Sequence, residues 1–191
     1  MSATQPVRLL SVVIVAVVVV VGIRGILNGL SFDGDPLDRH HGGAPRDATA
    51  VDAHRTRGTV AYVLDGDTIQ VTTRSGRSVR VRFLGISAPE IPHPGKAGEC
   101  YGYPATRHLK QLLPVGTHVV LMSDPTQENA DVYGRVLRYV EAGGRDVGAA
   151  QISAGSAAAR DSARPVLRHL RYARLENRAR GQRLGMWSAC S

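Results

Sequence analysis

The pattern of short apolar runs in the middle of the chain predicts β-strands joined by tight turns. Runs rich in Val and Ile are interrupted at Asp65-Gly66 and at Ser75-Gly76. Such residue pairs are typical of the turns in β-hairpins. We therefore expect three consecutive strands, at about residues 59–64, 68–73 and 79–86.

The pattern further along predicts two more strands and three helices. Pro104 fits the first turn of a helix that reaches about residue 113, because proline lacks only an amide that would be unpaired there. Strands are expected at 117–122 and 136–140. Asp146 is a candidate N-cap for a short helix, and a last helix is expected at 163–180. Five strands with helices after the third and the fifth are typical of an α+β fold, a five-stranded OB-fold β-barrel with about three helices.

The N-terminal segment is almost entirely apolar from Leu9 to Ile23. A run of this length lies between the apolar core of a signal peptide and a spanning helix. Arg8 precedes it, which favours an N-terminus in the cytoplasm and the rest of the chain outside. No clear cleavage site follows, so an uncleaved anchor is favoured over a cleaved signal peptide.

These features predict three regions. Residues 1–31 would form a signal or transmembrane anchor, and 32–55, rich in Gly, Asp, His, Arg and Pro, a flexible linker. Residues 56–191 would form the folded domain. The expected location is the cell membrane with the domain outside, or secretion if the anchor is cleaved.

The formal net charge of +8 indicates an anionic partner, either nucleic acid or a membrane surface. Only Lys96 and Lys110 are lysines among the 24 basic residues, so an arginine-rich genome is an equally good explanation of the charge. The last predicted helix carries arginines at three- and four-residue steps, which would form a phosphate-facing patch or a solvated face. These are Arg164, Arg168, Arg171, Arg174 and Arg178.

The only two cysteines are Cys100 and Cys190. An even count in an exported domain predicts one disulfide. It would close a long loop and stabilise the fold by about 4–5 kcal/mol in the chain-entropy model. The alternative is two free thiols in a reducing compartment.

Asp67 is the first candidate for chemistry. It has the strand parity of Ile69 and Val71, so its carboxylate is expected on the core side of the strand. A buried carboxylate needs a cationic side chain or a metal ion as a partner. Arg82 lies on the third predicted strand, but parity alone does not bring it to Asp67.

Three segments of the chain together resemble the signature blocks of the staphylococcal nuclease (thermonuclease) family. They are residues 65–68, 82–90 and 131–135, followed by Leu-Gly-Met-Trp at 184–187. The resemblance extends from about residue 56 to 187 and is that of an exported bacterial form. It implies the OB-fold and a calcium-dependent endonuclease that hydrolyses DNA and RNA with little sequence preference, a reaction that suits a hard cation.

The resemblance also assigns roles to single residues. It implies that Asp67 and the carbonyl of Ala88 bind Ca²⁺ and that Glu90 is the general base or an outer-sphere partner of the ion. Arg82 and Arg135 would hold the scissile phosphate, which suits a planar guanidinium.

Tyr133 would line the nucleotide pocket. Ser87 departs from the family, which usually has an aspartate there, so the third calcium ligand would be a neutral hydroxyl and the ion would bind more weakly. The family's stacking tyrosines before the last helix are also missing, and Arg160 or Arg164 are the candidates to replace them.

Three functions remain open at this point. The first is the calcium-dependent nuclease. The second is a nucleic-acid-binding module of the same fold, catalytically weakened by the change at Ser87. The third is an envelope domain whose basic helix contacts anionic lipid or polymer. We expect a monomer without a protein partner.

Overall fold

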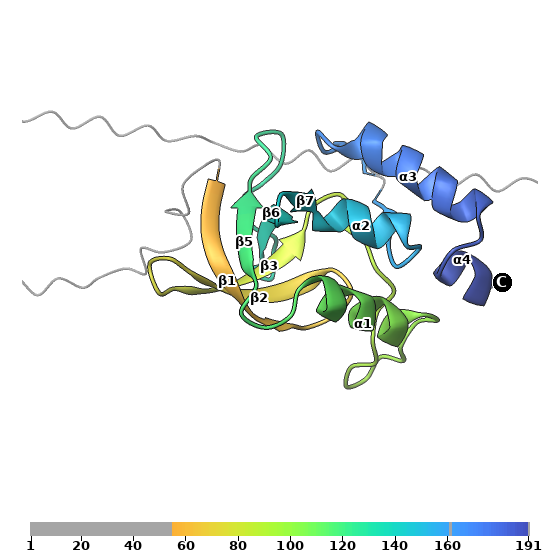
Figure 1. Cartoon of the computed structure of the whole chain (residues 1–191), viewed down its shortest axis with the longest axis horizontal. Helices are drawn as coiled ribbons and strands as arrows, with labels where there is room; N and C mark the ends of the chain where they lie inside the picture. The colour runs from red at the N-terminus through yellow and green to blue at the C-terminus, as the bar shows by residue number, and fades with distance from the viewer. Residues whose placement is uncertain (1–54, 161, 191) are drawn as a thin grey trace, which may run out of the picture. The chain divides into compact units, whose positions relative to one another are not determined.

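The structure is a computed structural model that describes residues 55–160 and 162–190. These residues form a closed barrel of five strands, in the order β3-β2-β1-β5-β6, and a parallel pairing of β3 with β6 closes it (Figure 1). This confirms the predicted OB-fold barrel. The strands are β1 (Arg55–Val63), β2 (Thr68–Thr73), β3 (Ser78–Phe83), β5 (His118–Met122) and β6 (Val136–Ala142).

Helices and three two-residue strands complete the domain. The helices are α1 (Gly102–Leu112), α2 (Val147–Ser153), α3 (His169–Gly181) and the single turn α4 (Met186–Ala189). The short strands are β4 (Ile86–Ser87), β7 (Arg145–Asp146) and β8 (Ala158–Ala159), and β4 pairs with β8. The expected anchor (1–31) and linker (32–55) lie outside the described residues, except for Arg55. No helix in the described ranges is long and apolar enough to cross a membrane.

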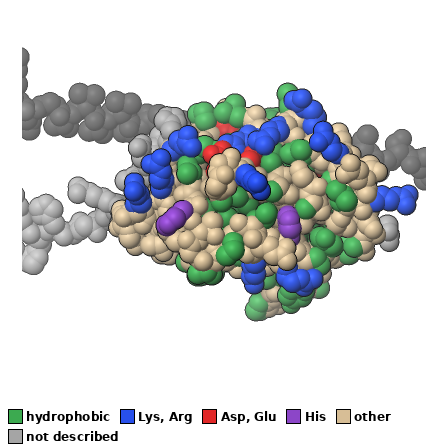
Figure 2. Space-filling view, in the orientation of Figure 1, with side chains coloured by type: hydrophobic (Ala, Val, Ile, Leu, Met, Phe, Trp, Pro, Cys, Tyr) green, Lys and Arg blue, Asp and Glu red, His purple; other side chains and the backbone are tan. Residues whose placement is uncertain are grey.

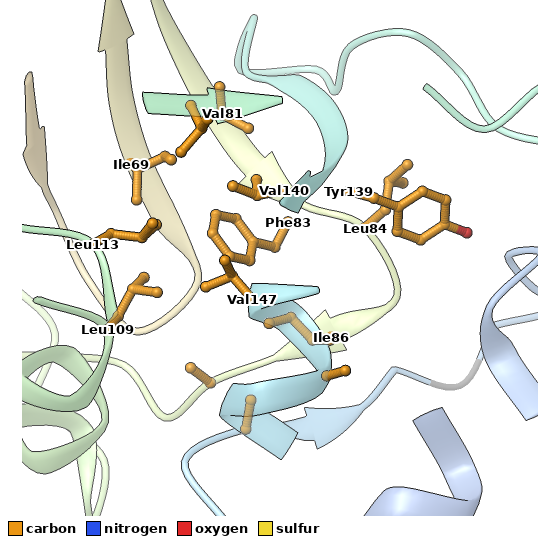
Figure 3. Packing of buried hydrophobic residues seen from close by; sticks show 14 of the residues in the cluster. Ile69, Val81, Phe83, Leu84, Ile86, Leu109, Leu113, Tyr139, Val140 and Val147 are labelled. Atoms are coloured by element: carbon orange, nitrogen blue, oxygen red, sulfur yellow. The ribbon is translucent and has the colours of Figure 1, made fainter. Parts of the chain in front are cut away.

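The core fills the barrel and continues under α1 and α2. Ile69, Val81 and Phe83 point inward from β2 and β3, and Leu109 covers one end of the barrel from α1 (Figure 3). Each fully buried side chain of this size contributes about 1.5–3 kcal/mol of hydrophobic stabilisation. Tyr139 lies at the edge of the cluster, with its hydroxyl group directed away from it (Figure 3).

Two predicted elements, the third strand and the last helix, have different bounds in the structure. The third strand ends at Phe83, not near residue 86, and turns at Gly85, whose φ is 73°. A Cβ atom at Gly85 would lie 2.6 Å from Cγ2 of Val166. Only glycine therefore allows both this backbone conformation and the close approach of the segment before α3.

The last helix begins at His169, six residues later than predicted. The segment before it is held as a loop: the Leu167 amide donates to Oδ2 of Asp124 at 2.8 Å, and the Arg168 amide donates to the Tyr139 hydroxyl at 3.3 Å. Burial acts to raise the pKa of Asp124, but hydrogen bonds, led by that from Tyr139, outweigh it and lower the pKa. The Asp124 carboxylate thus competes with helix formation at these residues.

Asp146 connects α3 to the rest of the domain through hydrogen bonds and ion pairs. It caps α2 as predicted, because its Oδ1 accepts the Ala149 amide at 3.0 Å. Its Oδ2 accepts hydrogen bonds from Arg168 at 2.7 Å and from Arg171 at 2.9 Å, and the Tyr172 hydroxyl donates to it at 3.1 Å. Arg168 and Arg171 therefore pair with a carboxylate of the same domain. The sequence predicted either a phosphate-facing patch or a solvated face for these arginines, and neither prediction includes this pairing.

The predicted disulfide between Cys100 and Cys190 is present and closes a sequence separation of 90 residues. It joins the loop before α1 to the end of α4. The C-terminal turn is thereby fixed to the loop that follows β4.

Candidate active site

Asp67 and Arg82 form a buried ion pair at one end of the barrel. Asp67 points inward, as its strand parity predicts, and its Oδ2 lies 2.9 Å from Nη2 of Arg82. The Ala88 amide donates to the same oxygen at 2.8 Å, and the Thr68 hydroxyl donates to Oδ1 at 3.1 Å. Burial raises the pKa of Asp67 to about 6, against the opposing effects of Arg82 and the Ala88 amide.

The Arg82 guanidinium is held by backbone carbonyls as well as by Asp67. Its Nη1 donates to the carbonyl oxygens of Phe83 at 2.8 Å and of Ile86 at 3.0 Å. Burial lowers the pKa of Arg82, while Asp67 raises it. These bonds use three of the roughly five N–H donors of a guanidinium, so two remain for a ligand. Because the chain turns after Phe83, its carbonyls wrap around the side chain, a contact that strand parity did not predict.

Gly66 lets the turn between β1 and β2 pack against the loop after β4. A Cβ atom at Gly66 would lie 2.5 Å from Cβ of Ala88. Asp65 stabilises the same turn, because its Oδ1 accepts the Asp67 amide at 3.0 Å. The sequence analysis treated Gly66 as a turn residue only. Its role in bringing Asp67 next to Ala88 depends on contacts between distant segments and carries no local signal.

A groove of about 420 Å³ opens beside Arg82 and is lined by the third signature segment. Nε of Arg135 donates to Oδ2 of Asp131 at 2.7 Å, and the guanidinium lies 5.4 Å from the ring centroid of the exposed Tyr133. Burial acts to raise the pKa of Asp131, but the hydrogen bonds and the charge of Arg135 outweigh it and lower the pKa. The groove therefore brings Arg82, Tyr133 and Arg135 together.

Arg160 is also part of the groove lining, whereas Arg164 is not. The Arg160 amide donates to the carbonyl of Gly85 at 2.9 Å, which fixes this residue at the groove rim. Of the two candidates to replace the missing tyrosines, the structure thus brings only Arg160 to the groove.

Glu90 lies outside the groove lining, in the loop that follows β4. Its backbone is clamped by Glu99: the Glu90 amide donates to Oε2 of Glu99 at 3.1 Å, and the Glu99 amide donates to the Glu90 carbonyl at 2.8 Å. The side chain of Glu90 is 37% exposed and lies 3.6 Å from Nε2 of His93. Glu99 carries no local sequence signal for this role, because its contact with Glu90 forms across an irregular loop.

The donors expected to hold Ca²⁺ are all oxygen atoms, and only one of the three groups is charged. Asp67 is the one carboxylate among them, Ser87 offers an exposed hydroxyl, and Ala88 offers a carbonyl. The described residues contain no group of three or more His, Cys, Asp or Glu suited to a metal. Among the described residues, Oδ1 of Asp67 accepts only the Thr68 hydroxyl, which leaves a lone pair that a hard cation could use. The charge of the Asp67 carboxylate is already balanced by Arg82.

Comparison with known proteins identifies the family. The family model described as staphylococcal nuclease homologue matches residues 80–189. An uncharacterized endonuclease of Escherichia coli is 37% identical over 134 residues, which are 69% of this chain and 76% of the relative. Two Bacillus subtilis (strain 168) proteins, endonuclease YncB and the SPbeta prophage-derived endonuclease YokF, are each 30% identical over 131 residues, 68% of this chain.

The chain belongs to the staphylococcal nuclease family. It spans less than two thirds of the length of the two Bacillus relatives, 61% of YncB and 43% of YokF. The match with the family model includes the second and third signature segments and the C-terminal turn, whereas Asp67 lies before it.

Proposed function

We propose that this chain is an endonuclease that hydrolyses phosphodiester bonds of DNA and RNA, depends on calcium and has little sequence preference. The observation that carries the proposal is the meeting of Arg82, Tyr133 and Arg135 at one groove, with Asp67 bound to Arg82 behind it. Guanidinium groups bind phosphates, and contacts to phosphates carry no sequence information. The three relatives described above are named as endonucleases, which supports the same activity.

In this proposal the two arginines bind the scissile phosphate. Within the described residues, Arg82 has two N–H donors without a protein partner, and Arg135 uses only its Nε, on Asp131. Their charges would stabilise the additional negative charge that develops on the phosphate oxygens as water attacks. Because Arg82 is fixed by two carbonyls and a carboxylate, it would meet the phosphate without reorganising.

Glu90 would act as the general base. It accepts a proton from the attacking water as the new bond to phosphorus forms, and the bond to the leaving sugar oxygen breaks. That oxygen takes up a proton from solvent. Asp67, Ser87 and the carbonyl of Ala88 would hold Ca²⁺, which supplies polarisation of the phosphate when bound.

The test is cleavage of single-stranded DNA and of RNA by the full chain, titrated with calcium and then with a chelator. We expect calcium-dependent cleavage that Glu90→Gln lowers by several orders of magnitude while the circular dichroism spectrum is kept. Arg107→Gln, an exposed change on α1 outside the groove, is the control for general effects of a charge-removing substitution. Cleavage that persists in Glu90→Gln would contradict the assignment of the base.

A second candidate function is binding of nucleic acid without catalysis, and the small negative charge at the expected calcium site supports it. Ser87 contributes no negative charge, and the Asp67 carboxylate is already balanced by Arg82. Salt-sensitive binding of oligonucleotides with no turnover at any calcium concentration would support this alternative.

We also propose export of the domain, anchored by residues 1–31 or released from them. The apolar run at 9–23 and the disulfide support this location, since disulfides persist in oxidising compartments. Fractionation of cells that express the full chain, with protease added from outside, tests it.

A further inference from the structure

A second cavity, of about 610 Å³, lies on the outer face of the barrel. β1, β2, β5 and the turn after β6 contribute to it, and it shares no lining residue with the active-site groove. We call it the basic trough and define it by Arg57, Thr59, Thr72, Arg74 and His118. No role in the proposed hydrolysis falls on any of these residues.

The strand register places these side chains in two adjacent rows. In one row, Thr59 lies opposite both Thr72 and His118, and its hydroxyl is 3.2 Å from Nδ1 of His118. In the other, Arg57 is next to Arg74, whose amide donates to the Arg57 carbonyl at 3.1 Å. Neighbouring strands are about 4.8 Å apart, so both rows offer hydrogen-bond donors over a short distance.

The charges of the trough are not balanced within the described part of the chain. Arg57 and Arg74 are exposed, and no described acidic side chain forms an ion pair with either of them. Glu141, which also lines the trough, is already paired with Arg55 at 3.7 Å and with Arg168 at 3.1 Å. Basic side chains gather over the start of β1 (Figure 2). Two exposed cations side by side repel each other, so the folding of the domain alone does not account for this pair of arginines.

We propose that the basic trough binds the phosphodiester backbone of a nucleic acid strand, as a second attachment point for substrate outside the active-site groove. The identity of the polymer rests on the proposed nuclease function. Arginines suit phosphate oxygens, and hydroxyl and imidazole groups add further hydrogen-bond donors. Gly58, Gly143 and Gly144 contribute only backbone to the lining, so a polymer chain can lie close to the strands.

The surroundings of the trough favour nucleic acid over a lipid surface. Lipid-binding surfaces combine basic residues with exposed apolar side chains that enter the bilayer. The strongly exposed apolar residues in the described ranges are elsewhere, and none of them lines the trough. They include Val132, Tyr133, Leu167 and Leu170.

The experiment measures binding of a fluorescein-labelled single-stranded DNA of about 20 nucleotides by anisotropy, with a chelator present to prevent cleavage. The full chain carries either Arg57→Gln with Arg74→Gln, or the control pair Arg107→Gln with Lys110→Gln. The control removes the same charge from an exposed face of α1.

We call Arg57→Gln with Arg74→Gln the trough pair and expect it to weaken the affinity for DNA by about tenfold or more. The control pair should weaken this affinity by about twofold or less. The slope of log K against log salt should fall by about 1.4 for the trough pair, since each phosphate contact on a single strand contributes about 0.7. Thr72→Lys, at an exposed position in the row of Thr59 and His118, should tighten binding and steepen the slope by about 0.7.

Equal losses of DNA affinity in the trough pair and the control pair would overturn the inference. The absence of DNA binding by the unmodified chain would overturn it as well. Loss of binding to phosphatidylserine vesicles in the trough pair, with DNA binding retained, would also overturn it and indicate lipid. Cleavage of a DNA of about five nucleotides should be unchanged in the trough pair. If the unmodified chain cleaves nothing but the trough effect on binding persists, the nuclease proposal fails and the trough inference stands.

Discussion

Replacing Arg82 by methionine is expected to cost much more stability than the same replacement at Arg135, although both should abolish turnover. Methionine retains most of the side-chain length but no charge and no donors. At position 82 it would leave the Asp67 carboxylate, which is 3% exposed, without its cation. It would also leave the carbonyls of Phe83 and Ile86 without their donor.

The magnitudes follow from the burial of the two pairs. Removing one partner of a buried ion pair costs about 3–5 kcal/mol of unfolding free energy, because the other charge stays buried and unpaired. Arg135 and Asp131 have side chains that are 26% and 18% exposed. A partly exposed pair of this kind contributes about 1 kcal/mol or less. Arg82→Met should therefore lie at least about 2 kcal/mol below Arg135→Met in stability.

Urea unfolding at neutral pH, followed by circular dichroism, measures this difference. Asp67→Asn serves as the partner in a double-mutant cycle with Arg82→Met. The double variant should be more stable than the sum of the single changes predicts, by about 1–3 kcal/mol, because the unpaired charge is gone. Arg82→Met and Arg135→Met of equal stability, or additive effects in the cycle, would refute the buried ion pair as described.

Three further predictions concern single residues. Ser87→Asp should tighten calcium binding by about tenfold or more in isothermal titration calorimetry, since affinity follows ligand charge; unchanged affinity would contradict the proposed ligand set. Glu99→Ala should lower kcat with little change in KM, because Glu99 holds the backbone of Glu90, while Glu99→Gln keeps the acceptor and should retain most activity; equal losses would count against this clamp. The pKa of Asp124 is lowered in the folded state, so its ionised carboxylate stabilises the fold. The difference in unfolding free energy between the unmodified chain and Asp124→Asn should therefore be complete above about pH 5 and shrink as the pH falls further. Urea unfolding measures this difference, and a difference that does not vary with pH would show that the charge of Asp124 does not stabilise the fold.

The sequence predicted those parts of the fold that depend on local patterns. The bounds of β2 and the N-cap at Asp146 follow from alternation and from a hydrogen bond within one helical turn. The inward direction of Asp67 follows from parity alone. Each of these requires only neighbouring residues, which a sequence displays directly.

The parts that could not be predicted depend on contacts between distant segments. Pro165 would lie in the first turn of the helix predicted at 163–180, but this prediction is wrong, because the hydrogen bond from Leu167 to Asp124 holds a loop there and the helix begins at His169. Arg82 reaches Asp67 across the pairing of β2 with β3, in which Arg82 lies opposite Thr68, and a sequence does not display this register between strands. The motifs therefore indicated which residues matter, while their geometry depends on tertiary packing.

The disulfide has a consequence for the biogenesis of the domain. Cys190 follows α4, and its partner Cys100 lies 90 residues earlier, in the loop before α1. The crosslink can form only after Cys190 has been synthesised. The loop that carries Glu90 therefore receives its covalent restraint late in the synthesis of the folded domain.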